Sequence, residues 1–265
     1  MALEKIEIKK EFGFDELEKR LRNVKLKGFQ DVKIYGDSNI SVQSFSPSMI
    51  YNDLFTPQPT VYKKDFLDRI DELQDMFIRK DIDIFNLDGG VDYVATEDNG
   101  TETEWTIIPP VVERVPIAFR FSNKVGNQVG LNYSGLLSDK LKKAMLKEGH
   151  SFNPELENLW FDEFDELDMV DKIPIICDGS HRIHFAYENE MNQKLVVIDG
   201  PTEGFPYYAA PQPYSKVDVE TRRPEFGGQG KVHVLTEPGH KLLYRLFPTG
   251  GILSGTVRKD KNDKS

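Results

Sequence analysis

The sequence has a single cysteine, Cys177, among 265 residues. One thiol can form no intramolecular disulfide and cannot build a cysteine-based zinc site, so we expect a cytoplasmic protein in a reducing compartment. The chain also lacks an apolar run of about 18 residues, which excludes a membrane-spanning helix. Its first residues alternate charged and aliphatic side chains and lack the apolar stretch of a signal peptide.

Positive charge is scarce relative to negative charge. The chain has 34 lysines and arginines against 44 aspartates and glutamates, and its formal net charge is -10. Proteins that bind duplex nucleic acid through its phosphates usually present a basic face. We therefore expect small-molecule partners rather than duplex nucleic acid or a membrane.

Several common nucleotide and catalytic motifs are missing. The sequence has no Gly-x-x-x-x-Gly-Lys-Ser/Thr, no Gly-x-Gly-x-x-Gly, no Gly-x-Ser-x-Gly and no His-Glu-x-x-His. A P-loop, a Rossmann dinucleotide site, an α/β-hydrolase and a zincin metalloprotease are therefore not indicated.

Hydrophobic periodicity predicts an α/β protein. After an opening strand and a short helix near residues 14–21, apolar side chains recur at helical spacing between Asp65 and Lys80. Two more helices are predicted near 138–149 and 153–168, and the acidic polar face of the second is interpreted as solvated rather than metal-binding. Further strands are expected at 31–35, 40–45, 82–87, 105–108, 116–121 and 232–235.

The strongest supersecondary pattern lies between residues 173 and 198. An apolar strand over 173–177 is followed by a tight turn, a helix from His181 to Glu190 and a second apolar strand from Leu195 to Ile198. This order indicates a βαβ-like unit, and the pattern leaves the direction of the strands open.

The turn before this helix contains groups that bind phosphate. Gly179 permits an unusual φ and a close backbone approach, Ser180 offers a hydroxyl, and His181 and Arg182 add donors beside the positive end of the helix dipole. Asp178 repels an anion, so it is assigned to a metal ion, an acceptor hydroxyl or a neighbouring base. The alternative is a purely structural turn, with an Asp or Ser cap and Arg182 in a salt bridge.

Residues 175–186, Ile-Ile-Cys-Asp-Gly-Ser-His-Arg-Ile-His-Phe-Ala, resemble the signature of the ParB/sulfiredoxin superfamily when taken with the strand at 195–198. That signature is an apolar strand, Asp-Gly-x-His-Arg, a helix and a second apolar strand. The helix at 65–80 and strand at 82–87 occur in the order of the family's opening half, and a long insertion follows them.

The resemblance implies one ParB/sulfiredoxin-like α/β domain with a mixed sheet over residues 1–257, with insertions and a C-terminal extension. The charged tail at 258–265 is predicted to be disordered. The resemblance also implies a nucleotide-binding domain, with the phosphates bound at the start of the helix that Gly179, Ser180, His181 and Arg182 open.

Members of this superfamily differ in their chemistry. They include CTP switches in DNA partitioning, enzymes that repair oxidised peroxiredoxin, small-molecule kinases and proteins described as nucleases. Sulfiredoxins carry a catalytic cysteine at the place of Ser180, and the partition proteins add an arginine-rich motif and a helical DNA-binding domain that we do not find after Asp199. These two activities are therefore disfavoured.

The small-molecule kinases of the superfamily use an upstream acidic residue as a base. Glu113, after the rigid segment 107–112, is the candidate for that role, and the alternative is a salt bridge with Arg114 or another base. Asp178 would position Mg²⁺ or the acceptor, with His181 as a further catalytic residue.

Two C-terminal segments could complete the site. Arg245, in a predicted basic helix from Pro238 to Phe247, would stabilise developing charge on the phosphates or only complement the helix dipole. Residues 200–230 are predicted to form a long irregular loop or lid. Its tyrosines, among them Tyr214, would line an acceptor pocket or anchor the loop to the core.

These residues together predict a kinase. We expect transfer of a phosphoryl group from ATP or ADP, with CTP as the alternative nucleotide, to a hydroxyl of a small molecule or modified nucleotide in the presence of Mg²⁺. A metal- or nucleotide-dependent nuclease and a non-catalytic nucleotide-sensing module are the alternative functions.

Overall fold

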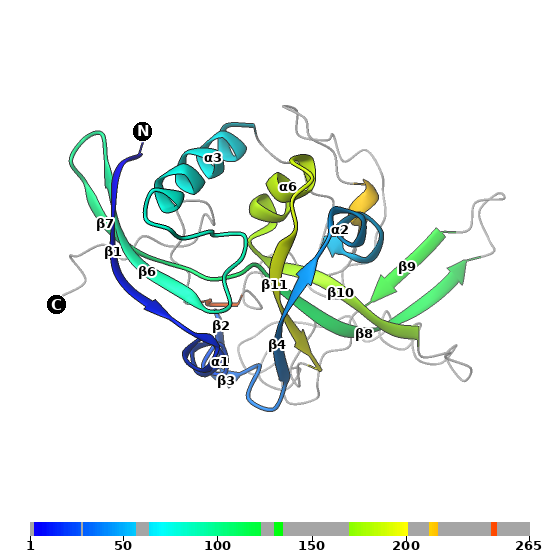
Figure 1. The fold of residues 1–265 in the computed structure, drawn as a ribbon. Helices are drawn as coiled ribbons and strands as arrows, with labels where there is room; N and C mark the ends of the chain where they lie inside the picture. Colours follow the sequence, from blue (N-terminus) through cyan, green and yellow to red (C-terminus); the bar gives the residue numbers. More distant parts are fainter. Residues whose placement is uncertain are drawn as a thin grey trace.

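The computed structural model describes residues 3–27, 29–56, 64–122, 130–134, 170–200, 212–216 and 245–247. Within these ranges the strands form a three-stranded sheet, a mixed seven-stranded sheet and a small two-stranded sheet (Figure 1). The predicted helices near 138–149 and 153–168, the strand at 232–235 and the tail at 258–265 lie outside the described residues.

The three-stranded sheet is antiparallel and has the order β1 (Leu3–Phe12), β6 (Gly90–Glu97), β7 (Glu102–Ile107). The helix α3 (Lys64–Ile78), which confirms the helix predicted between Asp65 and Lys80, covers one face of this sheet (Figure 1). Phe77 of α3 packs edge-on against Tyr93 of β6, with ring centroids 5.1 Å apart. The apolar stripe of α3 is therefore buried against this sheet.

The seven-stranded sheet is the centre of the fold, and it is mixed, as expected. β8 runs parallel to β11 and antiparallel to β10 and β9, while β10 is parallel to β5 and β11 is antiparallel to β4. The order is β12 (Gln212–Pro213), β5 (Phe55–Thr56), β10 (Val170–Asp178), β8 (Val111–Ser122), β11 (Gln193–Asp199), β4 (Asn39–Phe45), with β9 (Gly130–Ser134) beside β8.

Helices cover both faces of this sheet. Neighbouring residues of a strand point to opposite faces, and accordingly Val111 and Val112 belong to different hydrophobic clusters. Val112 packs with Ile183 of α6 (Ser180–Glu188) and Ile50 of α2 (Pro47–Asp53). Tyr214, which begins the short 3-10 helix η1 (Tyr214–Lys216), is buried in the same cluster.

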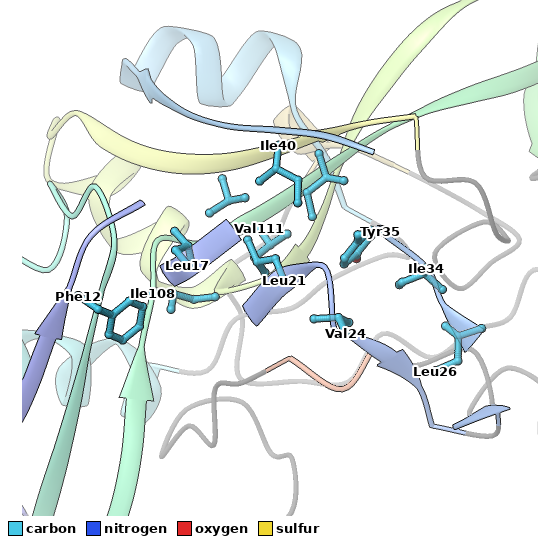
Figure 2. Close-up of a cluster of buried hydrophobic side chains, with 12 residues drawn as sticks. Phe12, Leu17, Leu21, Val24, Leu26, Ile34, Tyr35, Ile40, Ile108 and Val111 are labelled. Atoms are coloured by element: carbon cyan, nitrogen blue, oxygen red, sulfur yellow. The ribbon is translucent and has the colours of Figure 1, made fainter. Parts of the chain in front are cut away.

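The opposite face is closed by α1 (Phe14–Leu21) and by the strands that follow it. Leu17 and Leu21 of α1 pack with Val111, Ile198 and Tyr35 in one cluster (Figure 2). The hairpin of β2 (Lys25–Leu26) and β3 (Phe29–Lys33) lies at the edge of this cluster.

Two predicted elements are wrong where the structure describes them. Residues 82–87 form a turn rather than a strand, because the Asp83 carboxylate accepts a hydrogen bond from the Phe85 amide (2.9 Å) and bends the chain. The apolar run is still buried, since Ile82, Ile84 and Phe85 belong to the α3 cluster. Residues 245–247, the expected end of a helix, are not helical, and Arg245 forms an isolated antiparallel bridge with Leu26 of β2.

In the part of the chain that the structure describes, every helix is too short or too polar to cross a membrane.

Candidate functional site

The Gly179 turn, which we define as residues 178–182, joins β10 to α6. Gly179 is the N-cap of α6, has a left-handed backbone (φ 74°, ψ 21°) and starts the helix through its carbonyl, which accepts from the Arg182 and Ile183 amides. The unusual φ expected for this glycine is confirmed. The cap has no side-chain hydrogen bond, so an Asp or Ser cap does not begin this helix.

Space as well as backbone geometry requires glycine at this position. A Cβ atom placed on Gly179 would lie 2.7 Å from Cβ of Pro110, closer than real Cβ contacts. Pro110 belongs to the connection between β7 and β8, so this connection packs directly against the turn. The turn is therefore held in one conformation by packing that only a glycine fits.

The buried side chain of Arg182 holds the turn against the β7–β8 connection. Its Nη1 atom donates to the carbonyl oxygen of Ile108 at 2.6 Å. Burial lowers the pKa of Arg182, and the negative charge of Asp178 partly opposes that effect. The structure thus directs the Arg182 guanidinium into the protein, where it fixes the β7–β8 connection.

Asp178 precedes the N-cap of α6, and His181 follows it in the first turn of the helix. Asp178 is the last residue of β10, is half-buried and pairs with Val111 of β8. His181 is half-buried in the first turn of α6, where burial and the neighbouring His184 lower its pKa to about 4. At neutral pH His181 therefore presents an uncharged imidazole.

His184 is a packed histidine. Its side chain is buried, Nδ1 lies 2.7 Å from the hydroxyl of Tyr214, and burial lowers the pKa of His184 to about 4. Tyr214 is itself buried and packs edge-on against Tyr187, so this tyrosine anchors its segment to the core. Among the described residues, no three His, Cys, Asp or Glu side chains gather as metal ligands.

Glu113 lies in a separate group of polar side chains, the Glu113 cluster, formed by Tyr35, Glu113, Cys177 and Arg245. Arg245 donates from Nε to Oε1 (2.9 Å) and from Nη2 to Oε2 (3.1 Å), and neither side chain of the pair is exposed. The Tyr35 hydroxyl also donates to Oε1 of Glu113. The structure therefore brings Glu113 and Arg245 together, in a salt bridge of the kind weighed as the alternative for Glu113.

The electrostatics of the Glu113 cluster follow from its burial. Burial and the nearby Glu113 carboxylate raise the pKa of Tyr35 and of the Cys177 thiol well above their ordinary values. Burial by itself would lower the pKa of the Arg245 guanidinium, but the nearby Glu113 and Tyr35 raise this pKa above its ordinary value. Tyr35 and Cys177 are thus neutral at neutral pH, and Arg245 is the cation that balances Glu113.

The Glu113 cluster and the helix α6 lie on opposite faces of the sheet. Glu113 shares the face of Val111, two residues before it, and Val111 packs with α1. The helix α6 packs on the other face, through Ile183 and Val112. Asp178, Ser180 and His181 are neighbours at the start of α6, whereas the Glu113 carboxylate accepts hydrogen bonds from Arg245 and Tyr35.

Sequence reasoning missed Tyr35 and Pro110. Tyr35 is 78 residues from Glu113 in the chain. The residues around Tyr35 form no recognisable motif, so the sequence gives no sign that it contacts a carboxylate. Pro110 was read only as part of a rigid segment. Its contact with Gly179 depends on the pairing of β8 with β10.

Residues 16–123 match the family model of the ParB CE domain. The matched segment contains Tyr35, Pro110 and Glu113 but ends before the Gly179 turn. No curated protein and no solved structure matches the chain.

Proposed function

We propose, for a chain whose residues 16–123 match the family model of the ParB CE domain, that the Gly179 turn binds nucleotide phosphates and that the protein transfers a phosphoryl group to a hydroxyl. The acceptor is a small molecule or a modified nucleotide. The observation that carries the proposal is the left-handed glycine that caps α6 without a side-chain bond. Such a helix start has backbone donors directed outward and the positive end of the helix dipole behind them.

The groups at the turn favour phosphate recognition by hydrogen bonds. The missing side chain at Gly179 lets a phosphate approach the backbone, and Ser180 and His181 follow in the first turn of the helix. Because His181 is uncharged at neutral pH, it contributes a hydrogen bond rather than a positive charge. Arg182 supports binding indirectly, by holding the turn against Ile108.

Asp178 suits a Mg²⁺ ion that arrives with the nucleotide. Protein sites for Mg²⁺ commonly supply one or two carboxylates, while phosphates and waters complete the shell. Asp178 supplies one carboxylate at the start of the Gly179 turn, the number that such a shared site needs. When bound, Mg²⁺ would neutralise phosphate charge.

The proton acceptor for the hydroxyl has two candidates. His181 lies at the turn and is neutral, so it can accept a proton from a hydroxyl held beside the phosphates. Glu113 lies on the α1 face of the sheet and accepts hydrogen bonds from Arg245 and Tyr35, so it would act only after Arg245 withdraws.

Calorimetric titration tests nucleotide binding directly. We would titrate ATP, ADP, CTP and GTP, with and without Mg²⁺, into the wild type and into Ser180→Ala and His181→Ala. Loss of one neutral hydrogen bond should weaken binding about 3- to 10-fold in each variant. Glu188→Ala, at the exposed far end of the same helix, is the matched control and should bind like the wild type. Absence of binding to the folded wild type would overturn the proposal.

A non-catalytic nucleotide sensor is the second candidate function, and the partners of Glu113 favour it. The Glu113 carboxylate, the expected base, makes its hydrogen bonds inside the protein to Arg245 and Tyr35. A kinase should consume nucleotide when an acceptor hydroxyl is supplied. Binding without turnover across an acceptor screen, together with a change in oligomeric state on loading, would favour the sensor.

A further inference from the structure

The strand β4 lies at one end of the mixed sheet, beside β11 (Figure 1). It pairs with β11 in unbroken register, from Asn39 opposite Asp199 to Phe45 opposite Gln193. Among the residues that the structure describes, no strand pairs with the other side of β4. Asn39 and Ser44 are exposed to solvent. This long edge of the sheet is therefore open.

The backbone groups of β4 divide between its paired side and its open side. In an antiparallel ladder, residue pairs that exchange two hydrogen bonds alternate with pairs that exchange none. Val42 lies opposite Val196, but the Val196 amide donates to the Pro110 carbonyl at 2.8 Å, away from β4. Val42 and Val196 are therefore a pair without hydrogen bonds. It follows that the N–H and C=O groups of Ile40, Val42 and Ser44 point toward the open side of β4.

Open edges of a sheet are usually protected from further pairing by charged side chains, by proline or by shortness. In this fold β1 has lysines and glutamates along its length, β7 has Glu102 and Glu104, and β12 is two residues long and contains Pro213. The sequence of β4 is Asn-Ile-Ser-Val-Gln-Ser-Phe, with no charged residue and no proline, and its pairing with β11 has no bulge. The open edge of β4 is thus suited to the addition of another strand.

We propose that β4 is a dimer interface, at which two copies of the chain pair their β4 strands antiparallel about a twofold axis at Val42. In this pairing Val42 lies opposite its own copy, and Ile40 lies opposite Ser44 of the second copy. These are the residues whose backbone groups point to the open side. Every outward N–H and C=O group of β4 in one copy therefore meets a partner in the other.

The side chains favour a second copy as the occupant of this edge. A strand that pairs with itself brings its centre opposite its own copy, where a charge would meet a like charge. The charged residue closest to β4 in the chain is Asp37, which would lie opposite Pro47 of the second copy. Ile40 and the half-buried Val42 belong to the apolar layer that packs against α1. Pairing would continue this layer from one copy into the next.

Hydrogen exchange read at single amides, over a range of protein concentrations, tests the pairing. The amides of Ile40, Val42 and Ser44 should exchange about tenfold or more slowly in the concentrated protein than in the dilute protein, because only the dimer gives them acceptors. The amides of Ser41 and Gln43 donate to β11 in both states and should exchange at an unchanged rate. Sedimentation equilibrium of the same samples should show a dimer.

Two variants of β4 test whether this edge holds the copies together. Ser44→Pro removes an outward N–H that has no acceptor within the described chain, and proline is tolerated at such positions of an edge strand. It should raise the dimer Kd about tenfold or more, since the twofold axis repeats the loss in both copies. Ser44→Ala keeps the N–H and is the matched control. Val42→Lys, a second variant, places two like charges opposite each other and should also weaken the dimer.

Cysteine cross-linking tests the register. In Val42→Cys the two new thiols belong to residues about 5.5 Å apart between Cα atoms, within the span of a disulfide. In Gln43→Cys the same residues would be about 8 Å apart, beyond that span. Oxidation should therefore link Val42→Cys into a covalent dimer and leave Gln43→Cys unlinked. The wild type, which has the thiol of Cys177, is the second control.

Several results would overturn the dimer. One is a monomer at every concentration. Another is a dimer that folded Ser44→Pro and Val42→Lys leave equally tight, because a different surface would then join the copies. A monomer whose Ile40, Val42 and Ser44 amides become protected only when an extended synthetic peptide is added would also exclude a second copy, and would assign the edge to a different strand. None of these measurements uses a nucleotide, so the dimer and the proposed function can fail separately.

Discussion

Arg245 and Glu113, 132 residues apart in the chain, form a two-bonded ion pair in which neither side chain is exposed. The pair ties residues 245–247 to the central strand β8, on the face of the sheet opposite α6. A pair of this kind is costly to desolvate and costly to break, since removal of one partner leaves a buried charge. Breaking this pair should therefore lower the free energy of unfolding by more than breaking an exposed pair.

The first prediction concerns the cost of breaking this pair. Arg245→Met should lower the free energy of unfolding by about 3–5 kcal/mol, because Glu113 then keeps its burial without a counter-charge. The double variant Arg245→Met with Glu113→Gln should recover about 2 kcal/mol or more, since an amide is neutral and still accepts from Tyr35. Urea unfolding followed by circular dichroism measures both.

An exposed ion pair gives the control for that experiment. Lys194→Met breaks the pair with Asp88, whose side chain is 72% exposed, and should cost less than about 1 kcal/mol. If the double variant is no more stable than Arg245→Met alone, the buried charge is not the source of the cost.

The second prediction separates backbone strain from steric contact at the Gly179 turn. Gly179→Ala adds a Cβ against Pro110 to a left-handed backbone and should destabilise by about 2–4 kcal/mol. Gly100→Ala has a similar φ of 77° but open space around the Cβ, so it should cost only about 1–2 kcal/mol. Thermal unfolding of the two variants compares them, and equal losses would exclude a steric contribution from Pro110.

The third prediction is a loss of stability in acid through His184. Burial lowers its pKa in the folded protein to about 4, below the ordinary 6.5. The unfolded chain therefore takes up a proton first as the pH falls, and stability from the neutral histidine is lost between these two values. The slope is at most about 1.4 kcal/mol per pH unit for one group.

A variant isolates the contribution of His184 to this acid sensitivity. His184→Gln keeps a polar group near the Tyr214 hydroxyl but cannot titrate, so its urea midpoint should fall less steeply between pH 6.5 and pH 4 than that of the wild type. Parallel curves would mean that the proton is taken up elsewhere, for example at His181, whose pKa is also about 4.

The fourth prediction concerns the junction between α1 and the three-stranded sheet. Arg20 donates from Nη1 and Nη2 to the two carboxylate oxygens of Asp92, at 2.8 and 2.9 Å, and its guanidinium lies 3.9 Å from the centre of the Phe12 ring. Arg20→Lys keeps the charge but loses the two-bonded geometry, so it should cost about 1–2 kcal/mol in urea unfolding. Lys9→Arg, in an exposed pair on β1, is the control and should not change the urea midpoint. A loss of the same size in both would contradict a geometric role for Arg20.

Local patterns predicted a large part of the fold. The stripe of α3 and the strand–turn–helix–strand unit of β10, α6 and β11 follow from hydrophobic spacing within short segments. The left-handed Gly179 was predicted for the same reason, since a tight turn before a helix favours glycine. By contrast, residues 82–87 look like a strand because they are apolar, but they are buried as a turn against α3.

What the sequence by itself determined was the helix α3, the β10–α6–β11 unit and the polar groups gathered in the Gly179 turn, because each depends on residues close together in the chain. Only the tertiary structure decided that Arg182 faces inward to Ile108 and that Glu113 belongs with Tyr35 and Arg245. It also decided that β11 runs parallel to β8 and antiparallel to β4. Strand order and register fix which face of the sheet each side chain occupies, and spacing along one strand does not specify its neighbours.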